Sequence, residues 1–465
     1  MAQLGAAGNP LRVAIVGSGP AGFYTVSNFL KHDDIVVEMD MYERLPTPFG
    51  LVRAGVAPDH QKYKTVTKGY DKSANISTFR FFGNVEYGKH VKLEDLQRYY
   101  HQVIFATGAQ SDRSLGIPGE TLEGSHSATD FVAWYNGHPD YADYQFNLDC
   151  EAAAIVGLGN VAIDVARILC KTPDELGATD MADYAVEALR HSRVKTVYIL
   201  GRRGPAQAAF TPPEIREMGE LEDADVHVLK EEAELDALSR EAMEASGDRN
   251  APKNVEAIQA YAQRESQDKN KQLTIRFLVS PVELIGDDQG RVSAVKIVRN
   301  EIFRDDNGRI GARPTGETET LPVGLVFRSV GYRGIPLPEV PFDDSAGVIP
   351  NVSGRVTDQD GSVLEGMYVA GWIKRGPSGV IGTNKVDAKD TVQCMVEDAK
   401  AGRTFSPEQP GVDEALAMVK TRQPDLVTYS DWKKIDEVEL ERGRESNRPR
   451  VKFTNLPDFL GVLER

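Results

Sequence analysis

Two segments of the chain share one pattern of apolar and polar positions. In each, a short apolar run is followed by a glycine-rich turn and then by apolar residues at helical spacing. The run at 13–16 precedes "GSGPAG" at 17–22, and the run at 153–156 precedes "GLGNVA" at 157–162. This order predicts a strand, a turn and a helix twice. The pattern therefore predicts an α/β fold with two Rossmann-like dinucleotide-binding domains.

The turn residues explain why each unit would take a dinucleotide. In the first turn, Gly17 permits the tight bend, Gly19 lets a pyrophosphate approach the backbone, and Gly22 lets the helix pack closely on the strand. The diphosphate then lies at a helix N-terminus, where free N–H groups and the helix dipole favour negative charge. The second turn has Ala162 at the third position, a variant commonly tolerated there.

The residues after the next strand distinguish the two nucleotides. Glu43 lies 21 residues beyond Gly22, the offset expected for an acid that binds ribose hydroxyls in FAD or NAD. In the second unit, Arg202 and Arg203 stand at that strand end, and two guanidinium groups suit the 2'-phosphate of NADP. A solvated strand end is the alternative for the arginine pair. We expect FAD in the first unit and NADP(H) in the second, with residues 171–193 as an insertion containing an extra helix.

Two similar strands indicate where the chain crosses between domains. Apolar runs within 100–110 and 324–334 each end in a small-residue turn. We predict a discontinuous FAD-binding domain, residues 1–110 and 335–465 with a C-terminal tail from about 407. The NADP-binding domain is then 111–334.

Other segments predict simpler features. Alternating residues in 274–300 around the turn at 288–290 predict a hairpin, with a second turn at 305–309. The charged span 214–272 has mostly helical periodicity, and 340–362 has the composition of a connector. Near the end, a strand and a glycine-rich loop precede a helix that we expect to begin at Thr383 or Asn384, good N-cap residues.

Composition and charge exclude several classes of function. The chain has 465 residues, 41% of them hydrophobic, and a net charge of -16. That charge disfavours non-specific binding to nucleic acid or anionic membranes. No apolar run approaches a membrane span, and the N-terminal segment lacks the pattern of a signal peptide. We therefore expect a cytoplasmic protein.

The cysteines predict no redox disulfide and no cluster or metal site. Cys150, Cys170 and Cys394 are widely separated and form neither a CxxC motif nor a metal-ligand spacing. We expect them to be small buried hydrophobic residues.

Eight motifs together resemble one family in order and spacing. They are "GSGPAGFY", "LPTPFGLVRAGVAPDH", "FRFFGNVEYG", "FATGAQSDR", "GLGNVAIDVARIL", "GRRGPAQAAFTPPEIRE", "RSVGYRG" and "GWIKRGPSGVIGTNKVDA". The chain resembles adrenodoxin reductase-type NADPH-ferredoxin reductases, most of all the actinobacterial members. The resemblance implies a glutathione reductase-like fold of two domains, tight binding of FAD, and transfer of electrons from NADPH to a ferredoxin-type iron-sulfur protein.

The resemblance also implies residues for each cofactor. For FAD they are Gly17, Gly19, Ala21, Gly22, Glu43, Leu51, the backbone near Tyr87, Trp372, Gly379, Val380 and Ile381. For NADP they are Arg113, Leu158, Gly159, Asn160, Val161, Arg202, Arg203, Glu214 and Gly379.

The implied catalytic residues begin with His60, which resembles the family's active-site histidine paired with a glutamate. Glu214 and Glu217 are both candidates for that partner, and three residues apart at a helix start they share a face. We assign Glu217 to the pair and Glu214 to NADP. Asp164 either orients this network or complements a helix dipole. Apart from the resemblance, His60 reads as a surface residue.

The acceptor is the least determined part of the interpretation. The helical region 230–248 is mostly acidic, whereas vertebrate members bind an acidic ferredoxin through basic residues. Other basic residues would then dock the partner: Arg190, Arg193, Lys195, Lys374 and Arg375. The alternatives are a diaphorase or quinone reductase, an electron-feeding subunit, and a non-catalytic FAD-binding redox sensor. The sequence predicts no oligomeric state.

Overall fold

The computed structural model describes residues 3–465, and the chain divides into two compact units. Unit 1 comprises Met1–Val56, His60–Ser111 and Tyr332–Arg465, and unit 2 comprises Ala57–Asp59 and Asp112–Gly331. The predicted crossings were at 110/111 and 334/335, and the association of 57–59 with unit 2 was not predicted.

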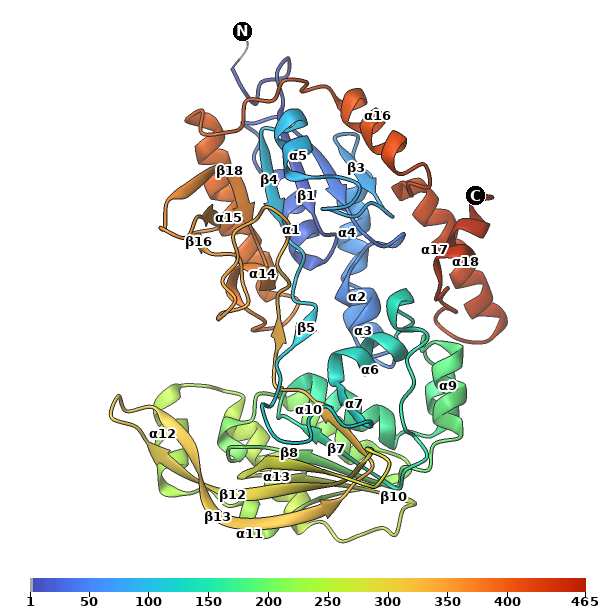
Figure 1. Cartoon of the computed structure of the whole chain (residues 1–465), viewed down its shortest axis with the longest axis vertical. Coiled ribbons are helices and arrows are strands. Elements are labelled where there is room, and N and C mark those ends of the chain that lie inside the picture. Colours follow the sequence, from blue (N-terminus) through green and yellow to red (C-terminus); the bar gives the residue numbers. More distant parts are fainter. Residues whose placement is uncertain (1–2) are drawn as a thin grey trace. The chain divides into compact units, whose positions relative to one another are not determined.

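Unit 1 is built on a mixed sheet of seven strands in the order β16-β17-β18-β4-β1-β2-β3 (Figure 1). The strands are β1 (Leu11–Val16), β2 (Val37–Tyr42), β3 (Phe79–Phe82), β4 (Gln102–Phe105), β16 (Asn351–Val352), β17 (Arg355–Thr357) and β18 (Val363–Val369). Strand β1 pairs in parallel with β2 and β4. It is buried along its whole length, which explains its continuous apolar run.

The helices of unit 1 belong to its N-terminal and C-terminal segments. They are α1 (Pro20–Phe29), α2 (Leu51–Ala54), α3 (Gln61–Lys64), α4 (Thr67–Ala74), α5 (Leu93–Tyr99), α14 (Trp372–Arg375), α15 (Thr383–Lys400), α16 (Val412–Arg422), α17 (Tyr429–Glu445) and α18 (Leu456–Val462). The expected late helix is α15, which begins at Thr383 as predicted, although its N-cap is Gly382 rather than Thr383 or Asn384. The Thr383 hydroxyl instead donates to the carbonyl of Val380 at 2.6 Å.

The C-terminal tail is part of the core of unit 1. Val419 of α16 is buried in one apolar cluster, and Trp432 and Ile435 of α17 are buried in another. No helix or strand was predicted for this segment, which begins at about residue 407.

Unit 2 contains a parallel sheet of six strands in the order β6-β14-β7-β8-β10-β9. The strands are β6 (Ser125–Ser127), β7 (Ala152–Val156), β8 (Thr196–Leu200), β9 (Ala224–Val228), β10 (Lys271–Arg276) and β14 (Leu325–Arg328). The helices are α6 (Ala128–Tyr135), α7 (Asn160–Cys170), α8 (Pro173–Gly177), α9 (Asp183–Arg190), α10 (Pro212–Glu217), α11 (Lys230–Ala233), α12 (Ala237–Ser246) and α13 (Ala251–Gln263). The two parallel-stranded cores confirm the predicted α/β class with two Rossmann-like units.

A three-stranded antiparallel sheet completes unit 2. Strands β11 (Val279–Gly286), β12 (Val292–Arg304) and β13 (Ile310–Pro322) pair in chain order, joined by the two predicted turns. The predicted hairpin is confirmed, and the second predicted turn joins β12 to β13.

Three predictions about the segments were incomplete or wrong. The span 214–272 is mostly helical as predicted, but it also contains β9, a five-residue strand whose short buried run shows neither period clearly. The insertion 171–193 contains two short helices rather than one. The connector 340–362 contains β16 and β17.

The chain crosses between the units along a short ribbon of two strands, β5 (Ser111–Asp112) and β15 (Tyr332–Arg333). On the unit 1 side, the amide of Gln110 donates to the carbonyl of Arg333 at 3.1 Å. On the unit 2 side, the amide of Arg113 donates to the carbonyl of Gly331 at 3.1 Å.

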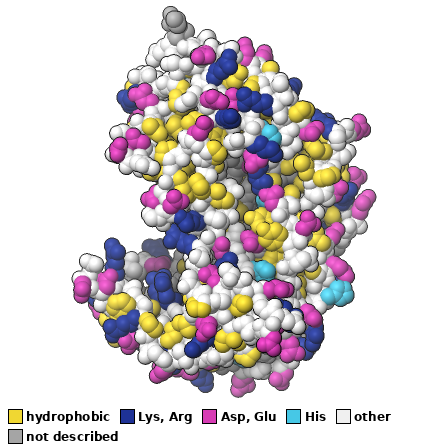
Figure 2. Space-filling view, viewed as in Figure 1, with side chains coloured by type: hydrophobic (Ala, Val, Ile, Leu, Met, Phe, Trp, Pro, Cys, Tyr) yellow, Lys and Arg dark blue, Asp and Glu magenta, His cyan; other side chains and the backbone are white. Residues whose placement is uncertain are grey.

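The surface carries both signs of charge. Figure 2 shows acidic and basic side chains interspersed over the face in view, although acids predominate in the sequence. Within residues 3–465, no helix has the length and apolar character needed to cross a bilayer.

Candidate functional site

The first glycine-rich turn has two glycines that packing requires and one that faces open space. Gly17 has φ +107°, and a Cβ there would lie 2.6 Å from the carbonyl oxygen of Ala106. A Cβ on Gly22 would lie 2.2 Å from the carbonyl oxygen of Gly17. A Cβ on Gly19 would meet nothing within 4 Å. The space beside Gly19 is therefore the place where a ligand could approach the backbone.

Helix α1 begins at this open position. Gly19 is its N-cap, with no side-chain capping hydrogen bond and no acidic residue in the first turn. The first N–H groups of the helix are thus available to an anion, and the dipole favours a diphosphate there. Ala21, another predicted FAD residue, is buried in this first turn.

Glu43 directly follows β2, at the carboxyl end of the strand next to β1. Its carboxylate accepts hydrogen bonds from the Ser18 amide at 3.1 Å and the Ser18 hydroxyl at 2.7 Å. It also accepts from the Leu45 amide at 3.0 Å. These bonds orient the acid beside the glycine-rich turn, where a ribose would lie.

The later predicted flavin residues belong to the same unit. The indole Nε1 of Trp372 is buried and has no hydrogen-bond partner among the described residues, so a bound ligand is a suitable acceptor. The backbone just before it lies close to α1, because a Cβ on Gly371 would be 2.7 Å from the Cβ of Ala21. Val380 is about half exposed in the loop before α15. The indole N–H of Trp372 and the side chain of Val380 are therefore both available to a ligand.

Leu51 and Tyr87 are the remaining predicted flavin residues. Leu51 is the first residue of α2 and is partly exposed. The Tyr87 hydroxyl donates to the carbonyl of Pro338 at 2.9 Å, and burial raises the pKa of this phenol above its ordinary value. This hydrogen bond to the backbone therefore holds the Tyr87 side chain in place.

The second turn repeats the geometry of the first. Gly157 has φ +142°, and a Cβ there would lie 2.2 Å from the carbonyl oxygen of Ser329. A Cβ on Gly159 would meet nothing within 4 Å, and Ala162 is fully buried. Helix α7 starts here with no side-chain cap and no acid in its first turn. The turn is a second place for a diphosphate.

The neighbouring predicted residues line this turn. Leu158 and Val161 are partly buried against the apolar core of unit 2. The side-chain oxygen of Asn160 accepts from the Thr211 amide at 2.8 Å, which ties the turn to α10. Arg113 is exposed beyond β5.

Arg202 and Arg203 follow β8, the strand beside β7. Both side chains are exposed, and neither has an acidic partner among the residues that the structure describes. Partial desolvation of the Arg203 guanidinium, although the residue is exposed, and the neighbouring charge of Arg202 lower the pKa of Arg203. Two unpaired cations in a protein of net charge -16 are suited to a dianion such as a 2'-phosphate.

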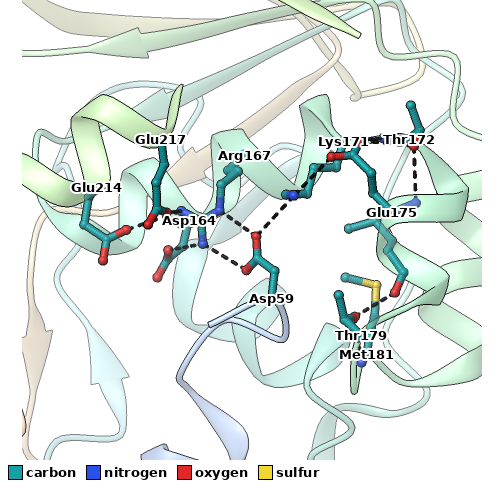
Figure 3. A network of polar contacts seen from close by, with 11 residues as sticks. Asp59, Asp164, Arg167, Lys171, Thr172, Glu175, Thr179, Met181, Glu214 and Glu217 are labelled. Atoms are coloured by element: carbon teal, nitrogen blue, oxygen red, sulfur yellow. Dashed lines mark hydrogen bonds and ion pairs between the residues drawn. The ribbon is translucent and has the colours of Figure 1, made fainter. Parts of the chain in front are cut away.

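A buried polar network surrounds Arg167 on α7 (Figure 3). Its guanidinium is 2% exposed and donates to Asp59 at 2.8 and 3.0 Å and to Asp164 at 2.7 Å. Its Nη1 lies 3.4 Å from Glu214 Oε2 and 4.0 Å from Glu217 Oε2. Burial opposes the charge, yet Asp164 and Asp59 raise the pKa of this guanidinium above its ordinary value. One cation therefore orders four carboxylates.

Three of the predicted active-site acids meet in this network. The carboxylates of Asp164 and Glu214 accept hydrogen bonds from Arg167. Glu217, at the end of α10, is more exposed than these two residues. His60 packs edge-on against Tyr63, with ring centroids 5.4 Å apart. The pairing of His60 with Glu217 stays a prediction, since the two residues belong to different units.

Arg167 and Asp59 were not among the site residues predicted from the sequence. Asp59 directly precedes His60, and Arg167 is three residues after Asp164 on α7. A charged residue on the otherwise apolar face of α7 was the available signal, because a buried arginine requires acidic partners.

Several residues proposed for partner docking already have acidic partners. Lys374 Nζ lies 2.9 Å from Asp387, and Arg193 Nη1 lies 3.4 Å from Asp149. Arg190 lies 3.7 Å from Glu187. These pairs reduce the free positive charge at the predicted docking positions.

The cysteines are free thiols. Cys170 is buried, and burial raises the pKa of its thiol to about 12, while Cys150 and Cys394 are partly exposed. The expected burial therefore applies fully to Cys170 alone.

Comparison with known proteins gives consistent relatives. A family model described as pyridine nucleotide-disulphide oxidoreductase matches residues 11–378. The chain is 47% identical to NADPH-ferredoxin reductase FprA of Mycobacterium tuberculosis, over 97% of this chain and 99% of the relative. It is 41% identical to mitochondrial NADPH:adrenodoxin oxidoreductase of Homo sapiens, over 97% and 92% respectively. These relatives confirm the resemblance seen in the motifs.

A solved structure shares the same fold throughout. The structure of Mycobacterium tuberculosis FprA in complex with NADPH aligns with a TM-score of 0.91 and 45% identity, covering 98% of this chain and 99% of the other.

Proposed function

Because the chain belongs to the pyridine nucleotide-disulphide oxidoreductase family, we propose that it is an FAD-dependent NADPH-ferredoxin reductase. The relatives named above are NADPH-ferredoxin and NADPH:adrenodoxin reductases and match almost the whole chain. The two glycine-rich turns supply the two nucleotide sites that such an enzyme needs.

The observation that carries the proposal is the pair of unpaired cations at Arg202 and Arg203. An acid at this position would bind a free ribose, the role that we propose for Glu43 in the first unit. Two guanidinium groups instead favour the 2'-phosphate that separates NADPH from NADH. The arginine pair therefore supports our proposal of NADP(H) in unit 2 and FAD in unit 1.

The residues of unit 1 fit a bound FAD. The open backbone at Gly19 and the uncapped N-terminus of α1 would hold the pyrophosphate, Glu43 the ribose, and Trp372 the other half of the cofactor. When bound, the flavin accepts the two electrons of a hydride together and passes them on singly.

The residues of unit 2 would hold NADPH in the matching way. The N-terminus of α7 would bind the diphosphate beside Gly159, and Arg202 and Arg203 the adenosine phosphate. Holding the nicotinamide in one orientation lowers the barrier to hydride transfer without any protein nucleophile. We assign this orienting role to His60 and Glu217. Within unit 2, a hydrogen bond from Arg167 fixes Asp164.

The acceptor that we propose is a ferredoxin-type iron-sulfur protein. The three cysteines are free and widely separated, so this chain offers no internal redox disulfide of its own. Single-electron transfer to a separate iron-sulfur protein suits that arrangement. A cytoplasmic location remains the expectation, and fractionation of cells tests it.

The testing experiment is NADPH-driven reduction of cytochrome c by the purified protein, with and without a ferredoxin from the same organism. We expect strong stimulation by ferredoxin and much poorer rates with NADH. Rapid bleaching of the flavin band by NADPH without ferredoxin stimulation would instead favour a diaphorase or quinone reductase. Equal bleaching by NADH and NADPH would contradict the assignment of Arg202 and Arg203.

A further inference from the structure

The C-terminal tail (residues 407–465) binds the short helix α2 through one arginine. Arg53 of α2 donates from Nη1 to Glu439 Oε2 at 2.8 Å and from Nη2 to Glu439 Oε1 at 2.6 Å. Glu439 lies on α17, 386 residues further along the chain. Its side chain is 0% exposed and that of Arg53 is 10% exposed. This is a forked, buried ion pair, the geometry in which arginine binds a carboxylate most specifically.

Glu439 has further partners that fix its carboxylate. It accepts from Arg450 Nη1 at 3.0 Å and from the backbone amide of Phe453 at 3.0 Å. All of these groups belong to the tail, so the carboxylate is in place independently of α2. A buried carboxylate with complete hydrogen bonding is a rigid anchor for the remaining cation.

Two more contacts from the tail secure the same helix. The Arg53 guanidinium carbon lies 5.2 Å from the ring centroid of Trp432, a cation–π contact. The ammonium group of Lys452 donates to the backbone carbonyl of Arg53 at 3.2 Å. The tail therefore holds both the side chain and the backbone of Arg53.

The segment just before α2 lies against the first glycine-rich turn. The Phe49 amide donates to the carbonyl of Ser18 at 3.0 Å, and Phe49 has φ +87° although it is not glycine. Gly50 has φ +49°, and a Cβ there would lie 3.0 Å from the Cα of Gly19. A positive φ at a non-glycine residue such as Phe49 persists only where the surroundings enforce it. The Phe49 ring also packs edge-on against Trp432, with centroids 5.9 Å apart.

We propose that Glu439 is a positioning residue for FAD: through Arg53 it holds residues 49–54 over the first glycine-rich turn, and so slows release of the cofactor. The inference rests on the placement of FAD at that turn proposed above. Leu51, implied as a flavin residue by the resemblance, is the first residue of the held helix. The tail thus has a defined role in cofactor retention.

The test compares release of FAD from four variants of the holoenzyme with the wild type, by the rise in flavin fluorescence after dilution. E439Q keeps the shape of the side chain and removes its charge. R53M removes the cation and leaves Glu439 paired with Arg450, so it keeps the tail intact. We expect both to release FAD about tenfold faster or more, since hydrogen bonds between charged groups are among the strongest.

Two matched controls separate positioning from general stability. E437Q changes an exposed acid on the same helix, paired with Arg444 at 3.0 Å. V419A removes buried methyl groups from α16, in a different apolar cluster from Val52. We expect both controls to release FAD within twofold of the wild type, although V419A lowers the melting temperature.

Hydrogen exchange of the apoproteins supplies a second readout. The amides of residues 52–56 donate within the turn 49–51, and we expect them to exchange faster in E439Q and R53M than in E437Q. FAD release within twofold of wild type in both E439Q and R53M overturns the proposal. An equal increase in V419A, or unchanged exchange of 52–56, also overturns it. Failure of the flavin placement itself would appear separately, as FAD retention in a Gly19→Ala protein.

Discussion

Arg167 and Asp59 are joined by two hydrogen bonds, from Nε to Oδ2 at 2.8 Å and from Nη2 to Oδ1 at 3.0 Å. The residues are 108 positions apart, and Asp59 is the neighbour of His60. These two hydrogen bonds therefore hold Asp59 in place, and with it the backbone that precedes the predicted active-site histidine.

Replacing Arg167 should strongly destabilise unit 2. In R167M, the carboxylates of Asp59, Asp164 and Glu214 would lose their shared cation, and breaking such buried pairs costs about 3–5 kcal/mol. Urea unfolding followed by far-ultraviolet circular dichroism measures the change. R190M, at an exposed position on α9, is the control and should stay near the wild-type midpoint. A small change in R167M would mean that the acids are protonated or hydrated in the native state.

Loss of His60 should slow turnover without abolishing it, because hydride transfer needs orientation rather than a protein nucleophile. We expect H60A to reduce the rate of flavin bleaching by NADPH roughly 10- to 100-fold, since small misplacements have effects of that size. Stopped-flow absorbance measures the rate. An undiminished rate would remove His60 from the mechanism.

The two open glycines should separate the two cofactors. A methyl group at Gly19 or Gly159 meets no protein atom within 4 Å, so G19A and G159A should both fold. We expect G19A to lose FAD during purification, and G159A to keep FAD but show a KM for NADPH raised by about tenfold or more. The flavin-to-protein absorbance ratio and steady-state kinetics measure these effects. Each variant is the control for the other, and equal effects of both on FAD content would contradict the assignment.

The arginine pair should determine the choice of nucleotide. We expect R202Q and R203Q each to raise the KM for NADPH by roughly 10- to 150-fold, the effect of about 1.5–3 kcal/mol for a charged hydrogen bond. The KM for NADH should change little, because it lacks the 2'-phosphate. R249Q, at an exposed position in unit 2, is the control. A proportional rise for NADH would show that the pair acts on something other than the phosphate.

Acid should destabilise unit 1 through His101. Burial and the charge of Arg12 lower the pKa of this imidazole from 6.5 to about 4, and its Nδ1 accepts from the Arg12 amide at 3.0 Å. Between pH 6.5 and 4 the unfolded state binds the proton that the folded state excludes, so stability falls as pH falls through this window.

The variant H101Q keeps a side-chain acceptor for the Arg12 amide and removes the titration. We expect its urea midpoint to depend less steeply on pH between 6.5 and 4 than that of the wild type. H191Q, which changes an exposed histidine, serves as the reference. Identical slopes in H101Q and the wild type would show that His101 is not the responsible group.

The sequence predicted the features that depend on neighbouring residues. The two turns, α1 and α7, and the charges at Glu43 and Arg202 follow from patterns a few tens of residues long. Strand β9 was missed because a five-residue buried strand carries little periodicity. The pairing of Arg167 with Asp59 and that of Arg53 with Glu439 could not be predicted, since each joins residues more than 100 positions apart. Only the folded arrangement brings such residues together.

Strands β5 and β15 pair with each other at the two places where the chain passes from one unit to the other. Arg113 and Gly331 meet at one end of this ribbon, and Gln110 and Arg333 at the other, so both units have their cut ends side by side. A gene encoding 112–331 alone, or one that joins Ser111 directly to Tyr332, would need no long linker. The excised unit 2 would nevertheless leave Arg167 without the carboxylate of Asp59. Such a rearrangement would thus separate residues 57–59, which lead into the predicted active-site histidine, from the unit with which they associate.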